Sequence, residues 1–263
     1  KQYAAYYQTI TGGGSLAGRA GAFAKPFIGG ILPLPLFLSG CRSFPGGRAA
    51  QPTKEMAMAG SGKMRVAMVG VGGFGGYRRE RMRETGLFEI VAAYDINAGA
   101  LERCVKEDGA KAAGSYEELL ATPGIEAMVI ATGGKFHAPQ ALAAMERGLH
   151  VFVEKPLCST RGETEALLAM QRKTGLVVGV GHNDHSHDGH SLAIRKLLED
   201  GSFGTVATVE KVTAHSGGLE IKPGDWRGDP DKNPGGMLFQ CGCHGLHELM
   251  FYFGPIREVT AMM

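Results

Sequence analysis

Residues 64–75, Met-Arg-Val-Ala-Met-Val-Gly-Val-Gly-Gly-Phe-Gly, decide the fold of this chain. A short apolar run leads into a Gly-x-Gly-x-x-Gly pattern, and a polar segment typical of a helix follows. In this pattern the first glycine permits a tight turn, the second lets the backbone approach a pyrophosphate, and the third allows a helix to pack closely on a strand. The start of the helix attracts phosphates. The candidate cofactor-binding residues of this loop are Gly70, Gly72, Gly73, Phe74 and Gly75.

A second strand-like run, residues 88–95, ends on Asp95 at the distance from the glycines where a dinucleotide-binding fold places an acid. The carboxylate is expected to bond the adenine ribose hydroxyls and to repel the extra phosphate of NADP, which favours NAD over NADP. An alternative for Asp95 is the N-cap of the next helix, and both roles can hold together. Arg78 and Arg79 could favour NADP by lying near the phosphates, but an exposed helix face is the preferred interpretation for both.

Strand-like and helix-like segments alternate at short spacing as far as Gly181. This alternation predicts an α/β fold with a parallel, doubly wound sheet, a Rossmann domain over residues 64–181. The later segments in this alternation are residues 116–123, 126–132, 138–148, 150–154, 161–175 and 176–180.

Composition limits the classes of partner. The chain has 263 residues, enough for two domains. Its 28 Lys and Arg balance 26 Asp and Glu, so it lacks the basic field that nucleic-acid binding needs. The five cysteines form no C-x-x-C pair and do not suggest a disulfide scaffold. We therefore predict a small-molecule partner and no nucleic acid.

Residues 1–63 differ from the rest and are predicted to lie outside the fold as a signal-like and linker segment. Residues 26–41 form a proline-broken apolar run that ends in Leu-Ser-Gly-Cys41, which resembles a bacterial lipoprotein signal box. Export with a lipid anchor on Cys41 is one interpretation. A cytoplasmic protein is the alternative, because the chain opens on Lys1, has no methionine before Met56, and could begin with untranslated upstream sequence.

The segment Val-Phe-Val-Glu-Lys-Pro, residues 151–156, ends a predicted buried strand on opposite charges. Ligands of such sheets bind beyond the carboxyl ends of the strands, so Glu154 and Lys155 are expected at the reactive end of the cofactor. A lysine there can act as a proton shuttle, with the glutamate and proline fixing its position. The alternative is a surface salt pair.

Several motifs occur together in the order seen in the Gfo/Idh/MocA oxidoreductases, and the chain resembles that family over Met64–Met263. The resemblance implies a second domain, residues 182–263, with an open, mostly antiparallel sheet that carries substrate and makes a homo-oligomer interface. It also implies that this domain is incomplete at its C-terminus. The motifs are the glycine loop, Thr132 with His137, Glu154 to Pro156, Asn183 in "GHN", and "PGG" followed by "GCH" at Pro234 to His244.

The resemblance further implies roles for individual residues. Lys155 is the expected catalytic lysine, and His244 the expected proton donor or acceptor beside the substrate. Gln240 stands where the family commonly has an aspartate, and an amide can orient a hydroxyl but cannot take its proton.

Other implied sites surround the cofactor and the substrate. Asn183 is expected near the nicotinamide ribose. Thr132 and His137 are expected to bind the cofactor from the family's loop after the fourth strand, where His137 could be purely structural. Trp226 and Arg227 are expected in a loop over the substrate, since an aromatic face beside a guanidinium suits a sugar ring or an acidic group. A tryptophan that anchors the loop is the alternative.

Two histidine-rich segments could suggest a metal site, but neither has the spacing of a closed one, and we predict none. We expect His185 and His187 to line the substrate mouth, and Cys241 and Cys243 to fill small apolar spaces where a helix starts. The segments contain His182, His185, His187 and His190, and Cys241, Cys243, His244 and His247.

The sequence thus predicts an NAD-dependent dehydrogenase for a secondary alcohol of a sugar, cyclitol or derivative. Two alternatives stay open: a glycosidase or lyase that keeps its NAD through a transient redox cycle, and a non-catalytic nucleotide-binding regulator.

Overall fold

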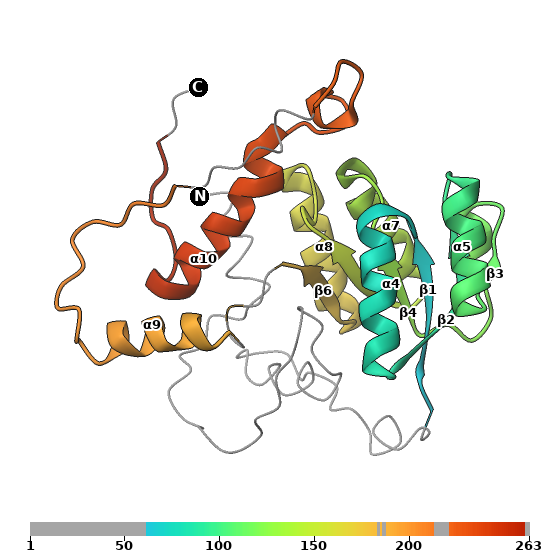
Figure 1. Cartoon of the computed structure of the whole chain (residues 1–263), viewed down its shortest axis with the longest axis horizontal. Helices are drawn as coiled ribbons and strands as arrows, with labels where there is room; N and C mark the ends of the chain where they lie inside the picture. Colours follow the sequence, from blue (N-terminus) through green and yellow to red (C-terminus); the bar gives the residue numbers. More distant parts are fainter. Residues whose placement is uncertain (1–61, 183–184, 186–187, 213–220, 261–263) are drawn as a thin grey trace. The chain divides into compact units, whose positions relative to one another are not determined.

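The computed structural model describes residues 62–182, 185, 188–212 and 221–260. The chain passes from one compact unit to the other between Gly181 and His182 (Figure 1). The predicted signal box with Cys41 lies outside the described residues, as do Asn183 and His187. Within the described ranges, no helix has the length and apolar character needed to cross a bilayer.

The first unit is built on a six-stranded parallel sheet with the order β3-β2-β1-β4-β5-β6. The chain runs outward from β1 to β3, returns, and runs outward on the other side, so the carboxyl ends of β1 and β4 meet where the order reverses. Such folds bind nucleotides at this switch point. The strands are β1 (Met64–Val69), β2 (Phe88–Tyr94), β3 (Lys111–Ala112), β4 (Ala127–Ile130), β5 (His150–Glu154) and β6 (Val178–Gly181).

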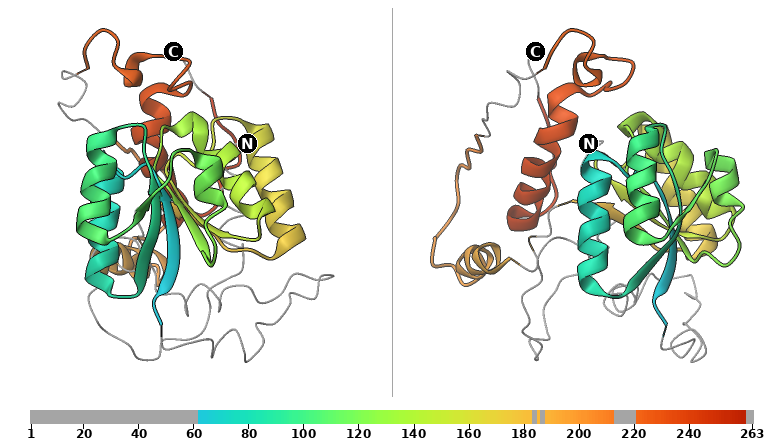
Figure 2. Two further views of the ribbon diagram at one scale, coloured as in Figure 1. Left: turned by 90° about the vertical axis from the view of Figure 1, so that its right-hand side faces the viewer. Right: turned by 45° about the vertical axis from the view of Figure 1, so that its right-hand side comes forward.

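Helices cover both faces of this sheet. Figure 2 shows α4 and α5 on one face and α7 and α8 on the other, the arrangement that right-handed crossovers produce. A capping box of Thr160 and Glu163 starts α8. The doubly wound parallel sheet predicted from the sequence is confirmed. The helices are α4 (Gly73–Thr85), α5 (Ala98–Asp108), α6 (Tyr116–Leu120), α7 (Gly134–Glu146) and α8 (Arg161–Thr174).

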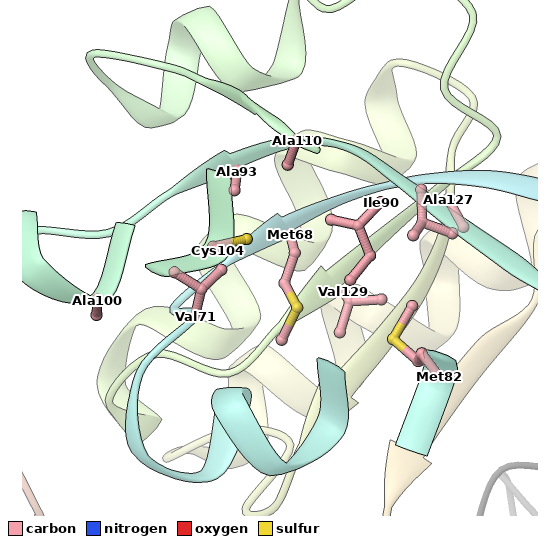
Figure 3. Packing of buried hydrophobic residues seen from close by; sticks show 11 residues of the cluster. Met68, Val71, Met82, Ile90, Ala93, Ala100, Cys104, Ala110, Ala127 and Val129 are labelled. Atoms are coloured by element: carbon pink, nitrogen blue, oxygen red, sulfur yellow. The ribbon is translucent and has the colours of Figure 1, made fainter. Parts of the chain in front are cut away.

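A buried cluster joins the central strands to α4 and α5. Figure 3 shows Met68, Ile90 and Val129 beside one another on neighbouring strands. Met82 of α4 and Cys104 of α5 complete this layer. Burial raises the pKa of the Cys104 thiol to about 12, so this cysteine stays neutral and serves as a packing group.

The described residues of the second unit are helical or irregular. They contain α9 (Gly189–Glu199), a 3-10 turn η2 (Trp226–Gly228), a short π-helical segment η3 (Leu238–Gly242) and α10 (Cys243–Phe253). No strand occurs among these described residues, so the open antiparallel sheet stays a prediction.

The first residue of β5, His150, is bound to the end of the connection between α8 and β6. Its Nδ1 atom accepts a hydrogen bond from the backbone N–H of Val177 at 3.0 Å, which requires an unprotonated Nδ1. Burial lowers the pKa of His150, and the nearby carboxylate of Glu126 only partly opposes this effect. Because the folded state disfavours the charged imidazole, protonation of His150 at low pH lowers the free energy of unfolding.

We predict that the first unit loses stability as the pH falls below about 6.5, the unfolded histidine value. Above that pH the contribution of His150 is fully present, and it is lost as the pH drops through the lowered folded pKa. The variant His150→Asn, whose amide oxygen can replace Nδ1 as acceptor but does not titrate, should lose about 1 kcal/mol less than the wild type between pH 7 and pH 5. Thermal unfolding across this range measures the difference, and parallel pH profiles would contradict the assignment.

Candidate active site

The loop between β1 and α4 is closely packed on its neighbours. Gly70 has φ 78°, and a Cβ there would lie 2.6 Å from the carbonyl carbon of Ala131, just beyond β4. A Cβ on Gly75 would lie 2.0 Å from the carbonyl oxygen of Gly70. Both positions therefore require glycine. Gly73, with φ 47°, has open space around its missing Cβ.

Asp95 fastens this loop. Its Oδ2 atom accepts hydrogen bonds from the N–H groups of Val71 at 2.8 Å and Gly72 at 3.1 Å, and Oδ1 accepts from the N–H of Asn97. A carboxylate offers roughly four acceptor positions, so capacity for a further donor remains. The N-cap of α5 is Asn97, which accepts from Ala100, so the alternative of Asp95 as that cap is wrong. Its bond to the ribose stays a prediction.

Two arginines of α4, Arg78 and Arg79, are buried, and the expected exposed helix face is wrong for both. Arg78 is 5% and Arg79 is 3% exposed. Arg79 pairs with Glu107 and Asp108 of α5, and Arg78 pairs with Glu154. Because carboxylates already balance both charges, neither arginine supports the binding of the extra phosphate of NADP.

The Glu-Lys-Pro tripeptide begins with Glu154, the carboxylate partner in the ion pair with Arg78. Glu154, the last residue of β5, is 4% exposed, and its partner is Arg78, so the surface salt pair is wrong. Lys155 is half-buried, and its peptide bond to Pro156 is cis. The tripeptide leaves the sheet at the carboxyl edge, the same edge that carries the glycine loop.

His137 joins two segments of that edge. The ring is 1% exposed, with Nδ1 2.7 Å from the carbonyl oxygen of Pro156 and Nε2 2.8 Å from that of Thr132. The hydroxyl of Thr132 in turn bonds Gln140 at 2.7 Å. The ring of His137 thus contacts backbone on both sides, which supports the structural alternative for this residue. Direct cofactor contact by Thr132 and His137 stays a prediction.

The cysteine beyond the tripeptide is a packing residue. Burial raises the pKa of the Cys158 thiol, which outweighs the opposing hydrogen bond with Thr164. The Sγ atom of Cys158 lies 2.9 Å from Oγ1 of Thr164. A neutral, buried thiol of this kind does not act as a nucleophile.

In the second unit, the two histidine-rich segments form one row of ring contacts. The ring centroid of His182 lies 5.1 Å from that of His244 and 5.0 Å from that of His247, and His185 lies 5.6 Å from His247. The i, i+3 spacing of His244 and His247 is the sequence feature that indicates that these two side chains lie on the same face of α10. Among the described residues, no group of three or more His, Cys, Asp or Glu is arranged to hold a metal.

The remaining predicted residues lie near the start of α10 and in η2. Gln240 falls in the π-helical segment, one turn before His244, and Cys243 is buried at the first residue of α10. The guanidinium of Arg227 lies over the ring of Trp226, with Cζ 4.8 Å from the centroid, and the tryptophan is 41% exposed. The expected aromatic and cationic pair exists, and its contact with substrate stays a prediction.

Two family models match the chain. Residues 64–182 match the model described as "Oxidoreductase family, NAD-binding Rossmann fold", and residues 191–263 match the "GFO/IDH/MocA C-terminal domain". The first unit is therefore an NAD-binding Rossmann domain.

Individual relatives agree with these matches. A 4-carboxy-2-hydroxymuconate-6-semialdehyde dehydrogenase from Sphingobium is 27% identical over 76% of this chain and 62% of its own length. The NADP-dependent scyllo-inositol 2-dehydrogenase IolW of Bacillus subtilis is 28% identical over 66% of this chain and 49% of its own length. The crystal structure of an NAD-binding protein from Listeria innocua is 28% identical, with a TM-score of 0.60, over 73% of this chain and 55% of that one. The chain thus spans only part of the length of each relative.

The close contact at Gly75 generates a prediction. In Gly75→Ala the new Cβ must move α4 away from the oxygen of Gly70, so NAD affinity should fall at least about tenfold and the unfolding free energy by about 1–3 kcal/mol. Calorimetric titration with NAD and thermal unfolding measure both effects.

The neighbouring variant Gly76→Ala is the matched control. Its Cβ would meet only the oxygen of Val71, at 3.5 Å, which is an ordinary contact. Alanine is also the better helix former by about 1 kcal/mol, so this variant should keep its NAD affinity and gain stability. Equal losses of affinity in the two variants would show that the Gly75 contact is not specific.

Proposed function

Because the chain belongs to the Gfo/Idh/MocA oxidoreductase family, we propose that it transfers a hydride between a secondary alcohol of a sugar, cyclitol or derivative and the nicotinamide of NAD. The observation that supports this most is the shared edge of the sheet. At this edge, the glycine loop held by Asp95 follows the end of β1. The tripeptide that carries Lys155 lies at the end of β5, a strand of the same sheet.

The residues of the loop fit a dinucleotide. Helix α4 begins without a side-chain cap and without acidic residues in its first turn, so its N–H groups suit a pyrophosphate. Asp95, with acceptor capacity left, suits a ribose hydroxyl, and its negative charge favours NAD over NADP. Phe74, 55% exposed at the start of α4, offers an apolar surface beside the phosphates.

Bound NAD supplies the hydride acceptor at its nicotinamide. In our proposal Lys155 takes the proton of the substrate hydroxyl, and His244 is the second proton donor or acceptor. Gln240 orients the hydroxyl without taking a proton, because an amide does not titrate. Asn183 is proposed to contact the nicotinamide ribose.

The substrate class rests on one relative and one surface feature. The relative scyllo-inositol 2-dehydrogenase acts, by its name, on a cyclitol. The stacked pair of Trp226 and Arg227 offers an aromatic face and a cation, which suit a sugar-like ring or an acidic substituent. We also propose that the second unit makes a homo-oligomer interface.

Lys155→Met tests the catalytic role. The variant should lose about 10²–10⁴-fold in kcat while NAD affinity stays near the wild-type value, because only proton transfer is removed. NADH formation is followed at 340 nm across a panel of sugars and cyclitols, after any nucleotide retained in purification has been identified. Lys173→Met, an exposed position near the end of α8, is the control and should match the wild type.

The outcomes separate the alternatives. Net NADH from one substrate, lost in Lys155→Met, supports the dehydrogenase. Retained NAD with cleavage of a glycoside and no net NADH supports the transient redox cycle instead. Nucleotide binding with neither reaction supports a regulator.

A further inference from the structure

The buried ion pair between Arg78 and Glu154 connects two parts of the candidate site. Arg78 comes from α4, directly after the glycine loop, and Glu154 precedes Lys155 at the end of β5. Nε of Arg78 donates to Oε1 of Glu154. Both side chains are 6% exposed, so the two charges are held out of water. Loss of one partner would leave a buried charge without compensation.

Aromatic rings fix the guanidinium of Arg78. Its Cζ atom lies 5.2 Å from the ring centroid of Phe74 and 5.2 Å from that of Phe152. Tyr77 adds a third ring at 6.0 Å. A planar guanidinium among rings is more restricted than an ammonium, so Arg78 offers its Nε–H in a defined direction.

A missing side chain fixes the carboxylate of Glu154. Gly181, at the end of β6, is the register partner of Glu154. A Cβ on Gly181 would lie 2.7 to 2.8 Å from all three atoms of the carboxylate group. The carboxylate therefore occupies the space that glycine leaves, with Arg78 as its ion-pair partner.

His137 holds the far end of the tripeptide through the carbonyl oxygen of Pro156, 2.7 Å from Nδ1. Lys155 thus lies between two anchored residues. Glu154, which the sequence suggests as a partner for Lys155, is instead paired with Arg78.

We infer that Arg78 is a positioning residue, which holds Glu154 so that Lys155 leaves β5 in a fixed direction relative to the glycine loop. The inference rests on the proposed function in taking Lys155 as the catalytic group. The placement of Lys155 can be measured without that assumption.

Two variants disturb the arrangement in different ways. Arg78→Met removes the cation, while Gly181→Ala removes no charge and displaces the carboxylate. In each, kcat should fall by about tenfold to a hundredfold, as expected for a misplaced catalytic group, while the Kd for NAD stays within about threefold. Gly181→Ala decides the question by itself if Arg78→Met fails to fold.

Arg79→Met is the matched control. Arg79 is the next residue of α4, is equally buried, and pairs with carboxylates of α5 rather than with Glu154. It should lower the melting temperature but keep kcat within about threefold of the wild type. An equal loss of kcat in Arg79→Met, or wild-type kcat in folded Arg78→Met and Gly181→Ala, would overturn the inference.

A double-mutant cycle shows whether Arg78 acts through Glu154. If it does, adding Arg78→Met to Glu154→Gln should lower kcat by no more than about twofold beyond the single Glu154→Gln change. Full additivity of the two losses would mean that Arg78 acts by another route.

A readout independent of turnover separates this inference from the proposed function. The acetylation rate of Lys155 by acetic anhydride, measured by peptide mass spectrometry relative to Lys173, should change at least about twofold in Arg78→Met and Gly181→Ala but not in Arg79→Met. If the wild type forms no NADH, or Lys155→Met stays active, the proposed function fails and the acetylation rates alone decide the positioning. Unchanged rates in both variants would refute it.

Discussion

The candidate site depends on the close approach of α4 to the loop before it. Gly75 lies so near the carbonyl oxygen of Gly70 that a Cβ would lie 2.0 Å from it. This contact sets the start and direction of the helix. The same helix then places Met82 in the core and Arg78 against the end of β5. Strand β5 comes four strands after β1 along the chain but lies only two positions from β1 in the sheet. One backbone contact therefore fixes both the cofactor loop and the partner of Glu154.

Local patterns predicted most of the first unit. The glycine spacing, Asp95 and the alternation of apolar runs each depend on neighbours within a short stretch of chain. The burial of Arg78 and Arg79 in α4 did not follow, because arginine on a polar helix is normally exposed. Their burial depends on carboxylates distant in sequence: Glu154 is 76 residues from Arg78. No local pattern identifies such a partner.

The second unit shows the same limit. The sequence pointed to His244 through a motif, but the contacts of His182 with His244 and His247 join segments about 60 residues apart. Spacing within each segment gave no reason to group them. The residue proposed for proton transfer, His244, therefore has a neighbouring ring that its own motif does not reveal.

The space at Gly181 has an evolutionary consequence. The carboxylate of Glu154 fills the space that a side chain on the neighbouring strand would occupy. Substitutions at positions 78, 154 and 181 therefore constrain one another. A side chain can be accepted at 181 only after the acid at 154 has shortened or moved. That change in turn removes the reason for an arginine at 78. Lineages of this chain should therefore inherit the three positions as one unit, and the order in which substitutions can accumulate there is restricted.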